Sequence, residues 1–189
     1  MYIALCGIDG SSKTTTINRI KKSNLDAIFT REPFNYEKIK TATKNMKDPH
    51  IRSYTMAIDR HCHMKDVIIP EKKAGKHIIS DRCYLCSLAY QSYQGVNLEW
   101  LMSIQPLNLV FPDHVIWFQC DPKIAALRSG EGEDMLTGVQ HTYGEILNSF
   151  DLPQVSWHPV NVDGKSEDEV YIEVAMLIEG LMRKHEQSF

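Results

Sequence analysis

The strongest constraint on this chain is a short glycine-containing segment between an apolar run and a helical pattern. Gly7-Ile8-Asp9-Gly10-Ser11-Ser12-Lys13-Thr14 directly follows the run Tyr2–Cys6. After a buried strand, such a segment directs backbone N–H groups, a lysine ammonium and a helix N-terminus at one point, which suits the phosphates of a nucleotide. We interpret it as a phosphate-binding loop, in which Lys13 contacts the β- and γ-phosphates and Thr14 holds Mg²⁺.

This loop departs from the pattern G-x-x-x-x-G-K-[ST] at one position. Ser12 stands where a glycine normally precedes the lysine, so a Cβ is added where the backbone must curl tightly. The alternative to a phosphate site is a strand–turn–helix corner with an incidental Lys-Thr pair.

Short apolar runs alternate with longer helical stretches along the whole chain. We predict strands at Tyr2–Cys6, Ala27–Thr30, His77–Ser80, His114–Gln119 and Val155–Val162. We predict helices at Thr14–Lys22, Asn35–Lys47, Ile51–Ala74, Cys83–Ser92, Glu99–Ile104, Pro122–Leu127, Asp134–Ser149 and Glu167–His185. Apolar strands that alternate with helices indicate an α/β fold of the P-loop NTPase class, with a five-stranded parallel sheet and helices on both faces.

Length and charge narrow the function classes. The 189 residues suit one domain, 1–189, and a net charge of −3 gives no basic field that would favour nucleic acid or an anionic membrane as partner. No apolar run approaches the roughly 20 residues that span a bilayer, and five cysteines suit reduced thiols better than a disulfide framework. We therefore expect a cytoplasmic protein.

Charged residues follow two predicted strands, where ligands collect in a doubly wound sheet. Arg31 follows the second strand in Thr30-Arg31-Glu32-Pro33, and Asp81-Arg82 follows the third. A guanidinium group can donate two parallel hydrogen bonds to a phosphate, and a carboxylate beside the loop can bind Mg²⁺ and its waters. In isolation an Asp-Arg pair is better explained by a helix N-cap and a surface arginine, but its position after a strand reverses that preference and favours a ligand site.

Two residues of the long predicted helix, Met56 and Arg60, lie one turn apart on one face. Together they could bind a flat ring, with the Met56 sulfur packed on its face and the Arg60 guanidinium donating hydrogen bonds to its edge. The alternative is a core methionine and a solvated arginine. His61-Cys62-His63 with Cys83-x-x-Cys86 could also be drawn as a zinc cluster, but consecutive side chains on a helix diverge by about 100°.

Taken together, these motifs resemble those of the thymidylate kinase family over nearly the whole chain. The resemblance rests on the Gly7–Thr14 loop, Thr30–Pro33, Asp59-Arg60, Ile69-Pro70 with Gly75, Asp81-Arg82 with Ser87-Leu88-Ala89-Tyr90-Gln91, Pro112-Asp113, Cys120-Asp121-Pro122 and Val162-Asp163-Gly164. It implies transfer of a phosphoryl group from ATP to a deoxynucleoside monophosphate, dTMP foremost, with Mg²⁺ and in a homodimer.

The resemblance also implies roles on the acceptor side. Arg31 and Arg82 would bind the acceptor phosphate, Asp9 the deoxyribose 3′-hydroxyl and Arg60 the base edge, while Tyr90 would exclude a 2′-hydroxyl. Further acceptor contacts fall on Met56, Ser87 and Gln91.

On the donor side, Lys13 and Thr14 would bind the ATP phosphates and Mg²⁺, with Asp81 ordering the waters of that ion. Further ATP contacts fall on Gly7, Gly10, Ser11, Ser12, Thr15, Asp163, Gly164 and Lys165.

Three positions depart from the family pattern. Met56 stands where the family has a phenylalanine against thymine, so base discrimination is expected to be looser. Cys83 and Cys86 replace a tyrosine and a serine without loss of charge, which we interpret as packing changes.

The lid, about residues 128–136, is short and acidic. Its only arginine is Arg128, and Gly10–Ser12 contain none, so Arg128 is by elimination the candidate for the catalytic arginine beside Lys13, Arg82 and Asp9. Three function classes remain open: a kinase for dTMP or a broader set of deoxynucleotides, a nucleotide-binding module with little or no catalysis, and a deoxynucleoside kinase. Arg31 and Arg82 argue against the last, because they suit an acceptor that already carries phosphate.

Overall fold

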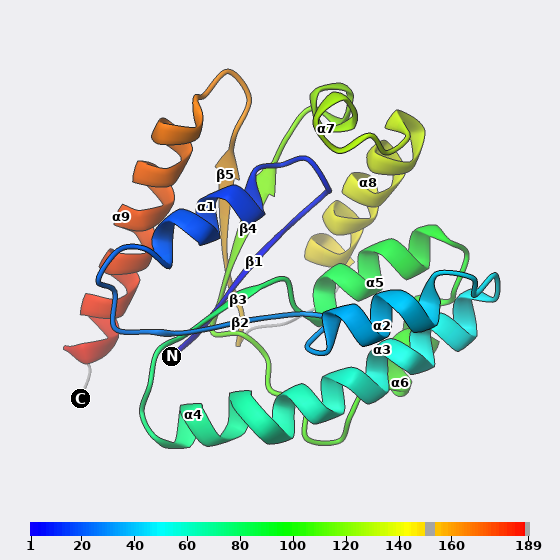
Figure 1. Ribbon diagram of the computed structural model, residues 1–189, viewed down its shortest axis with the longest axis horizontal. Helices are drawn as coiled ribbons and strands as arrows, with labels where there is room; N and C mark the ends of the chain where they lie inside the picture. The colour runs from blue at the N-terminus through cyan, green and yellow to red at the C-terminus, as the bar shows by residue number, and fades with distance from the viewer. Residues whose placement is uncertain (150–153, 188–189) are drawn as a thin grey trace.

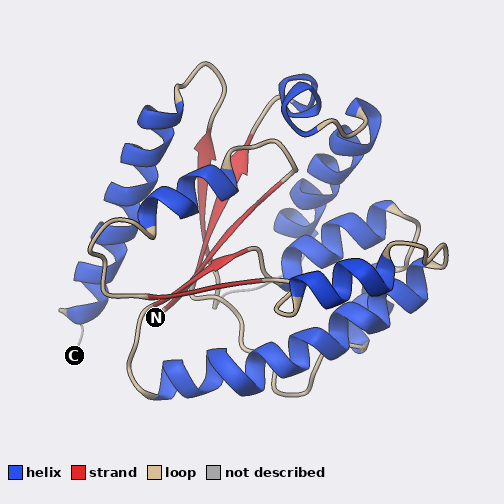
Figure 2. Cartoon of the chain, in the orientation of Figure 1, coloured by secondary structure: helices blue, strands red, loops and turns tan. Residues whose placement is uncertain are grey.

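The computed structural model describes residues 1–149 and 154–187 and has a five-stranded parallel sheet at its centre (Figures 1 and 2). The strand order is β2-β3-β1-β4-β5. The strands are β1 (Tyr2–Gly7), β2 (Ile28–Arg31), β3 (Ile78–Asp81), β4 (His114–Gln119) and β5 (Ser156–Asn161). The predicted α/β fold with a five-stranded parallel sheet is confirmed.

The central strand, β1, is buried along its whole length. It pairs with β3 on one side and β4 on the other, so its apolar run has helices over both faces and no solvated side. In the register, Leu5 lies opposite Asp81, and Arg31 lies opposite Asp81 on the next strand. The carboxyl ends of β1, β2 and β3 therefore meet at one edge of the sheet.

Helices cover both faces of the sheet, as predicted. One face carries α1 (Lys13–Ile20) and α9 (Glu167–Glu186), which pack on each other. The other side carries α5 (Tyr84–Tyr93), α8 (Glu133–Ser149) and α3 (Pro49–His63), with α5 between the other two (Figure 1). The shorter helices are α2 (Tyr36–Thr43), α6 (Leu98–Ser103) and α7 (Pro122–Ser129).

The predicted helix Ile51–Ala74 is a continuous helical path that starts two residues earlier and contains a change of pitch. α3 runs into a π-helical turn at Met64–Ile68 and then into α4 (Ile69–Lys73). Pro70 stands at the start of α4 and has no N–H to donate, so the wider turn falls where the normal helical ladder cannot be completed. No helix in the described ranges is long and apolar enough to cross a bilayer.

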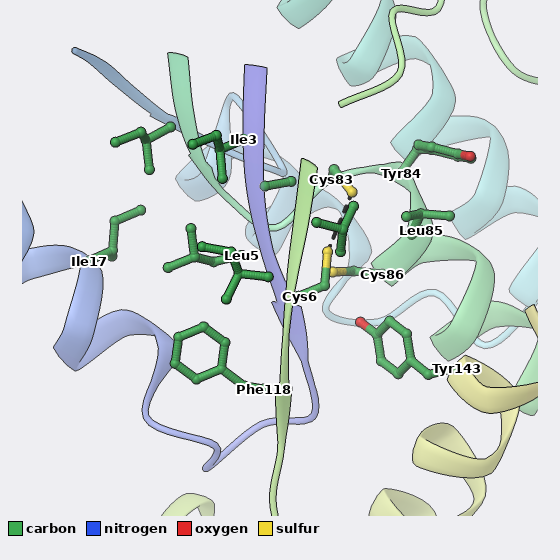
Figure 3. Close-up of a cluster of buried hydrophobic side chains, with 14 of the residues drawn as sticks. Ile3, Leu5, Cys6, Ile17, Cys83, Tyr84, Leu85, Cys86, Phe118 and Tyr143 are labelled. Atoms are coloured by element: carbon green, nitrogen blue, oxygen red, sulfur yellow. Dashed lines mark hydrogen bonds between the residues drawn. The ribbon is translucent and has the colours of Figure 1, made fainter. Parts of the chain in front are cut away.

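One hydrophobic cluster fills both sides of β1 (Figure 3). Leu5 packs with Ile17 and Phe118 on the α1 side, whereas Cys6 faces α5 and α8 on the other. Because alternate residues of β1 are anchored in opposite layers, the strand that leads into the loop at Gly7 is fixed on both faces.

Candidate active site

The segment after β1 folds as a phosphate loop around a buried lysine. Lys13 is only 3% exposed, and its ammonium group donates hydrogen bonds to the Ile8 carbonyl oxygen at 2.5 Å and to Ser11 Oγ at 3.0 Å. Burial lowers the pKa of Lys13, and the nearby charge of Arg82 lowers it further, to about 8. Burial therefore makes the charged form of Lys13 costly in the empty loop, and the negative charge of a bound phosphate would offset that cost.

Close backbone approaches fix the shape of this loop. Gly10 has φ +82°, and a Cβ there would lie 2.2 Å from the carbonyl oxygen of Ala125 in α7, so only glycine fits. Ser12 also has a left-handed conformation, φ 67°, which costs a non-glycine residue roughly 1–2 kcal/mol. The loop therefore forms with serine in the usual glycine position, at the expense of local strain.

The Ser12 hydroxyl makes no capping hydrogen bond to α1, although Ser12 is the residue that precedes this helix. Instead Oγ lies 3.5 Å from Nη1 of Arg128, in the last turn of α7. Arg128 thus reaches the loop from beside the segment between α7, which ends at Ser129, and α8, which begins at Glu133, where the sequence predicts the lid.

A cavity of about 350 Å³ opens over the loop. Its lining consists of Asp9, Gly10, Ser11, Ser12, Lys13, Thr14, Thr15, Arg82, Arg128, Lys165 and Glu167. We call it the donor cavity. It brings together most of the predicted ATP contacts with the predicted catalytic arginine.

A second cavity, of about 300 Å³, lies beside the first between α3 and α5. Its lining consists of Asp9, Glu32, Pro33, Tyr36, Arg52, Met56, Asp59, Arg60, Arg82, Cys83, Cys86, Ser87, Tyr90, Gln91 and Gln94. We call it the acceptor cavity. All predicted acceptor contacts except Arg31 lie in its wall.

Asp9 and Arg82 line both cavities and form an ion pair between them. The Tyr90 hydroxyl donates to Asp9 Oδ2 at 2.9 Å, which orients the carboxylate. Burial alone would raise the pKa of Asp9, but the charges of Arg82 and Lys13 outweigh that effect and lower it. Arg82 has φ 74°, and its N–H donates to the Leu5 carbonyl at 3.0 Å, so the backbone turns sharply to place this side chain at the junction.

Arg60 is held rigidly in the wall of the acceptor cavity. Its guanidinium donates to Glu32 Oε2 at 2.9 Å, to Ser87 Oγ at 2.7 Å and to Gln105 Oε1 at 2.6 Å. The side chain is only 2% exposed, so the alternative of a solvated surface arginine is wrong. Burial would raise the pKa of Glu32, but the charge of Arg60 lowers it below its ordinary value.

Arg31 lies at the carboxyl end of β2 but outside the lining of both cavities. Its guanidinium carbon sits 3.9 Å from the centre of the Tyr36 ring, a cation–π contact with a residue of the acceptor cavity. Its Nε atom is buried and has no hydrogen-bond partner among the described residues. Arg31 therefore lies behind the wall of the acceptor cavity and contacts Tyr36, which lines it.

Three predicted ATP contacts also lie outside the donor cavity. Gly7 is enclosed beneath the loop, with the Phe118 carbonyl oxygen 2.6 Å from the place a Cβ would occupy. Asp163 accepts hydrogen bonds from the Asp121 N–H at 2.9 and 3.0 Å, tying the ends of β4 and β5 together, and Gly164 makes no part of the lining. In the 163–165 turn, only Lys165 reaches the donor cavity.

The two residues predicted to handle a magnesium ion lie in different surroundings. Thr14 is exposed in the donor cavity, whereas Asp81 is buried at the end of β3, outside the lining of both cavities, and its Oδ1 atom is unpartnered among the described residues. Such a carboxylate oxygen is free to accept a hydrogen bond, which fits the waters of a Mg²⁺ ion. The zinc alternative fails: no cluster of three or more His, Cys, Asp or Glu side chains suited to a metal exists in the described ranges.

Two charged side chains in the wall of the acceptor cavity, Arg52 and Glu32, were not predicted from the sequence. Arg52 lies one helical turn before Met56 and two before Arg60, so extending the same i, i+4 face would have found it. Glu32, the third residue of Thr30–Pro33, binds Arg60 from a different element. Such a pairing leaves no local signal in the sequence.

The buried loop lysine, the parallel sheet and the two cavities joined at an Asp–Arg pair define a P-loop nucleotide kinase. The sequence model of the family Thymidylate kinase matches residues 5–150. The chain belongs to the thymidylate kinase family, as the resemblance of its motifs predicts.

Curated relatives agree with this assignment. A thymidylate kinase of Finegoldia magna is 33% identical over 173 residues, which cover 79% of this chain and 85% of the relative. A probable thymidylate kinase of Staphylothermus marinus is 33% identical over 134 residues, 67% of each chain. A thymidylate kinase of Francisella tularensis subsp. novicida is 29% identical over 199 aligned positions, 94% of this chain and 95% of the relative.

Proposed function

We propose that this kinase transfers the γ-phosphoryl group of ATP to a deoxynucleoside monophosphate, with dTMP as its main acceptor and dTDP as product. The observation that carries the proposal is the Asp9–Arg82 pair, which lines both cavities at their junction. Donor and acceptor phosphates bound on the two sides would meet at one guanidinium. Phosphoryl transfer needs this kind of in-line positioning and charge neutralisation more than covalent chemistry.

On the donor side, the loop N–H groups and Lys13 would hold the β- and γ-phosphates. Arg128 would neutralise charge on the transferred group, because it lines the same cavity and its guanidinium lies beside Ser12. Lys165, also in the lining, would lie by the nucleoside part of ATP.

On the acceptor side, Asp9 would accept a hydrogen bond from the 3′-hydroxyl and Tyr90 would close the space of a 2′-hydroxyl. Arg60 would donate to the base edge while Met56 packs on the ring face. Ser87 and Gln91 complete this wall, and Arg31 would contribute charge to the acceptor phosphate from behind Tyr36.

Mg²⁺ would be held by the Thr14 hydroxyl, with Asp81 binding its waters. When bound, this ion supplies positive charge that stabilises the β- and γ-phosphate oxygens. For this role, Asp81 has one carboxylate oxygen without a hydrogen-bond partner among the described residues. Its negative charge also raises the pKa of Lys13, against the larger lowering by burial and by Arg82.

We further propose one domain spanning 1–189, a cytoplasmic location and a homodimer formed through α3. Ile51, Tyr54 and Ile58 follow one another at helical spacing and are 52%, 51% and 68% exposed. An apolar stripe of this kind is typical of a contact between copies of a chain. Ile58→Glu should therefore shift sedimentation from dimer to monomer, whereas Glu179→Gln, a change at an exposed residue of α9, should not.

The function is tested by ADP release, coupled to a colour reaction, with dTMP, dUMP, dCMP, dGMP and dAMP as separate acceptors. We expect ADP release with dTMP to exceed that with each other acceptor. If nucleotides raise the melting temperature but no acceptor releases ADP, the chain is a nucleotide-binding module and not a kinase.

A further inference from the structure

Three thiols meet in the core directly beneath the site. Cys6 in β1 lies with its sulfur 3.4 Å from that of Cys83, which follows β3, and the sulfur of Cys86 in α5 lies against the same Cys6 side chain (Figure 3). All five cysteines of the chain are free thiols. Cys83 and Cys86 also line the acceptor cavity, where they are 1% and 5% exposed, so the cluster borders that cavity on one side.

The surroundings of Cys86 differ from those of an inert buried cysteine. Burial alone would raise the pKa of Cys86, but the neighbouring Cys6 thiol and the positive charge of Arg82 outweigh it and lower the pKa to about 6. The Tyr143 hydroxyl points toward this sulfur and also acts to lower the pKa of Cys86 (Figure 3). Cys6, by contrast, has its pKa raised well above the ordinary value, chiefly by burial.

We propose that the cluster is a reversible oxidation site for hydroperoxides, in which Cys86 is the reacting thiol and Cys6 the resolving thiol. The arrangement supplies what such a site needs: an anionic sulfur beside a guanidinium at a cavity wall, and a second thiol in contact with it. Cys83 holds Cys6 in place through the 3.4 Å sulfur contact.

The chemistry balances with hydrogen peroxide as the only co-reactant. The Cys86 thiolate attacks one peroxide oxygen, the O–O bond breaks, and the leaving hydroxide takes up a proton to become water, which leaves Cys86 as a sulfenic acid. The Cys6 sulfur then attacks the Cys86 sulfur, the S–O bond breaks, and the leaving hydroxide takes the Cys6 proton. Two thiols lose two electrons and one peroxide becomes two waters.

Formation of this disulfide would act on the site through two short connections. Cys6 immediately precedes Gly7, which packs closely against β4, with the Phe118 carbonyl oxygen 2.6 Å from the place a Cβ of Gly7 would occupy, so a displacement of Cys6 would pass to the start of the phosphate loop. The thiolate of Cys86 is also a counter-charge of Arg82, and that charge disappears in a disulfide. We therefore expect the oxidised protein to lose phosphoryl transfer, a consequence that rests on the proposed function.

The test exposes the full-length protein to hydrogen peroxide, blocks remaining thiols with N-ethylmaleimide and maps disulfides by mass spectrometry of tryptic peptides. The expected product joins peptide 1–13 to peptide 83–123 and reverts with dithiothreitol. Cys86→Ser should abolish this crosslink. Cys6→Ser should leave Cys86 as a sulfenic acid that dimedone traps, while Cys83→Ser and the control Cys62→Ser should still form the crosslink.

Kinase activity is measured on the same samples, each variant compared with its own untreated state. We expect at least about a tenfold loss of kcat/KM in the oxidised wild type, recovered on reduction, and no reversible loss in Cys86→Ser. A crosslink that persists in Cys86→Ser, or a Cys86 that stays unmodified while the protein is inactivated, overturns the proposal. The mass readout needs no catalysis, so a protein without kinase activity would contradict the proposed function and still decide the oxidation chemistry.

Discussion

Arg60 and Glu32 form an ion pair in the wall of the acceptor cavity, 2.9 Å between Nε and Oε2, with side chains 2% and 5% exposed. Glu32 also faces His63, whose Nδ1 lies 3.4 Å from the other carboxylate oxygen. The pair joins the turn after β2 to α3. It therefore fixes both the cavity wall and the guanidinium that we assign to base recognition.

Removal of this carboxylate charge should destabilise the fold. In Glu32→Gln, the buried Arg60 charge loses its counter-ion, and breaking a buried pair costs about 3–5 kcal/mol. The free energy of unfolding in urea measures the effect, and the exposed Glu179→Gln is the matched control, expected to change stability by less than about 0.5 kcal/mol. A loss as small as that of the control would mean that the pair adds nothing to stability.

Lys13→Ala should reduce turnover by at least about 10²-fold, because the ammonium stabilises charge on the transferring group. Since the pKa of Lys13 is about 8 in the free protein, ATP phosphates should raise it and cause proton uptake on binding near pH 8.5. Calorimetry in buffers of different ionisation enthalpy measures that uptake. Equal uptake by Lys13→Ala and wild type would assign the proton to another group.

Met56→Phe should sharpen the preference for dTMP. A flexible thioether accepts several ring shapes in the acceptor cavity, whereas a rigid ring favours one. We therefore expect wild-type activity with at least one further acceptor, and a larger kcat/KM ratio of dTMP over that acceptor in the variant. Strict use of dTMP by the wild type would contradict the argument.

Arg128→Ala should lower kcat by about 10³-fold with smaller changes in both KM values, as for a contact that is strongest in the transition state. Steady-state kinetics measures this, with the exposed Arg183→Ala as control for loss of a surface charge. An unchanged kcat would mean that Arg128 serves only the contact with Ser12.

Acid should destabilise the fold through a histidine pair at the far end of the sheet. His158 Nε2 and His114 Nδ1 lie 3.2 Å apart, a contact that requires one ring nitrogen to accept. Burial lowers the pKa of both, so the unfolded chain takes up protons first as pH falls. Their contribution to stability is present above about pH 6.5 and is lost as pH falls below it.

Urea unfolding at pH 7.5 and pH 5 measures this loss. His158→Gln should reduce the difference between the two pH values, whereas the exposed His141→Gln should leave it as in the wild type. The same difference in both variants would locate the acid sensitivity elsewhere.

The sequence predicts well whatever depends on neighbours along the chain. Apolar runs such as Tyr2–Cys6 identify the buried strands, and the ends of β2 and β3 place Arg31 and Asp81 at one edge, although each strand begins and ends one residue later than predicted. The loop at Gly7–Thr14 is equally local.

Contacts that depend on packing between distant elements escape this reasoning. Glu32 meets Arg60 only because the turn after β2 folds against α3, and Arg31 turns onto Tyr36 and not into the cavity. Cys83 and Cys86, interpreted from the sequence as separate packing changes, belong to one cluster, because β1 brings Cys6 between them. No spacing along the chain encodes such a meeting.

The 2.2 Å limit between Gly10 and Ala125 has a mechanical consequence. Because the loop is seated against α7 and Arg128 lies on that same helix, a change in the packing of α7 would displace the loop and the arginine together. Met56 and Arg60, to which we assign contacts with the base, lie on α3 instead. Acceptor choice could therefore be redesigned through substitutions on α3 that leave the packing of the phosphate loop unchanged.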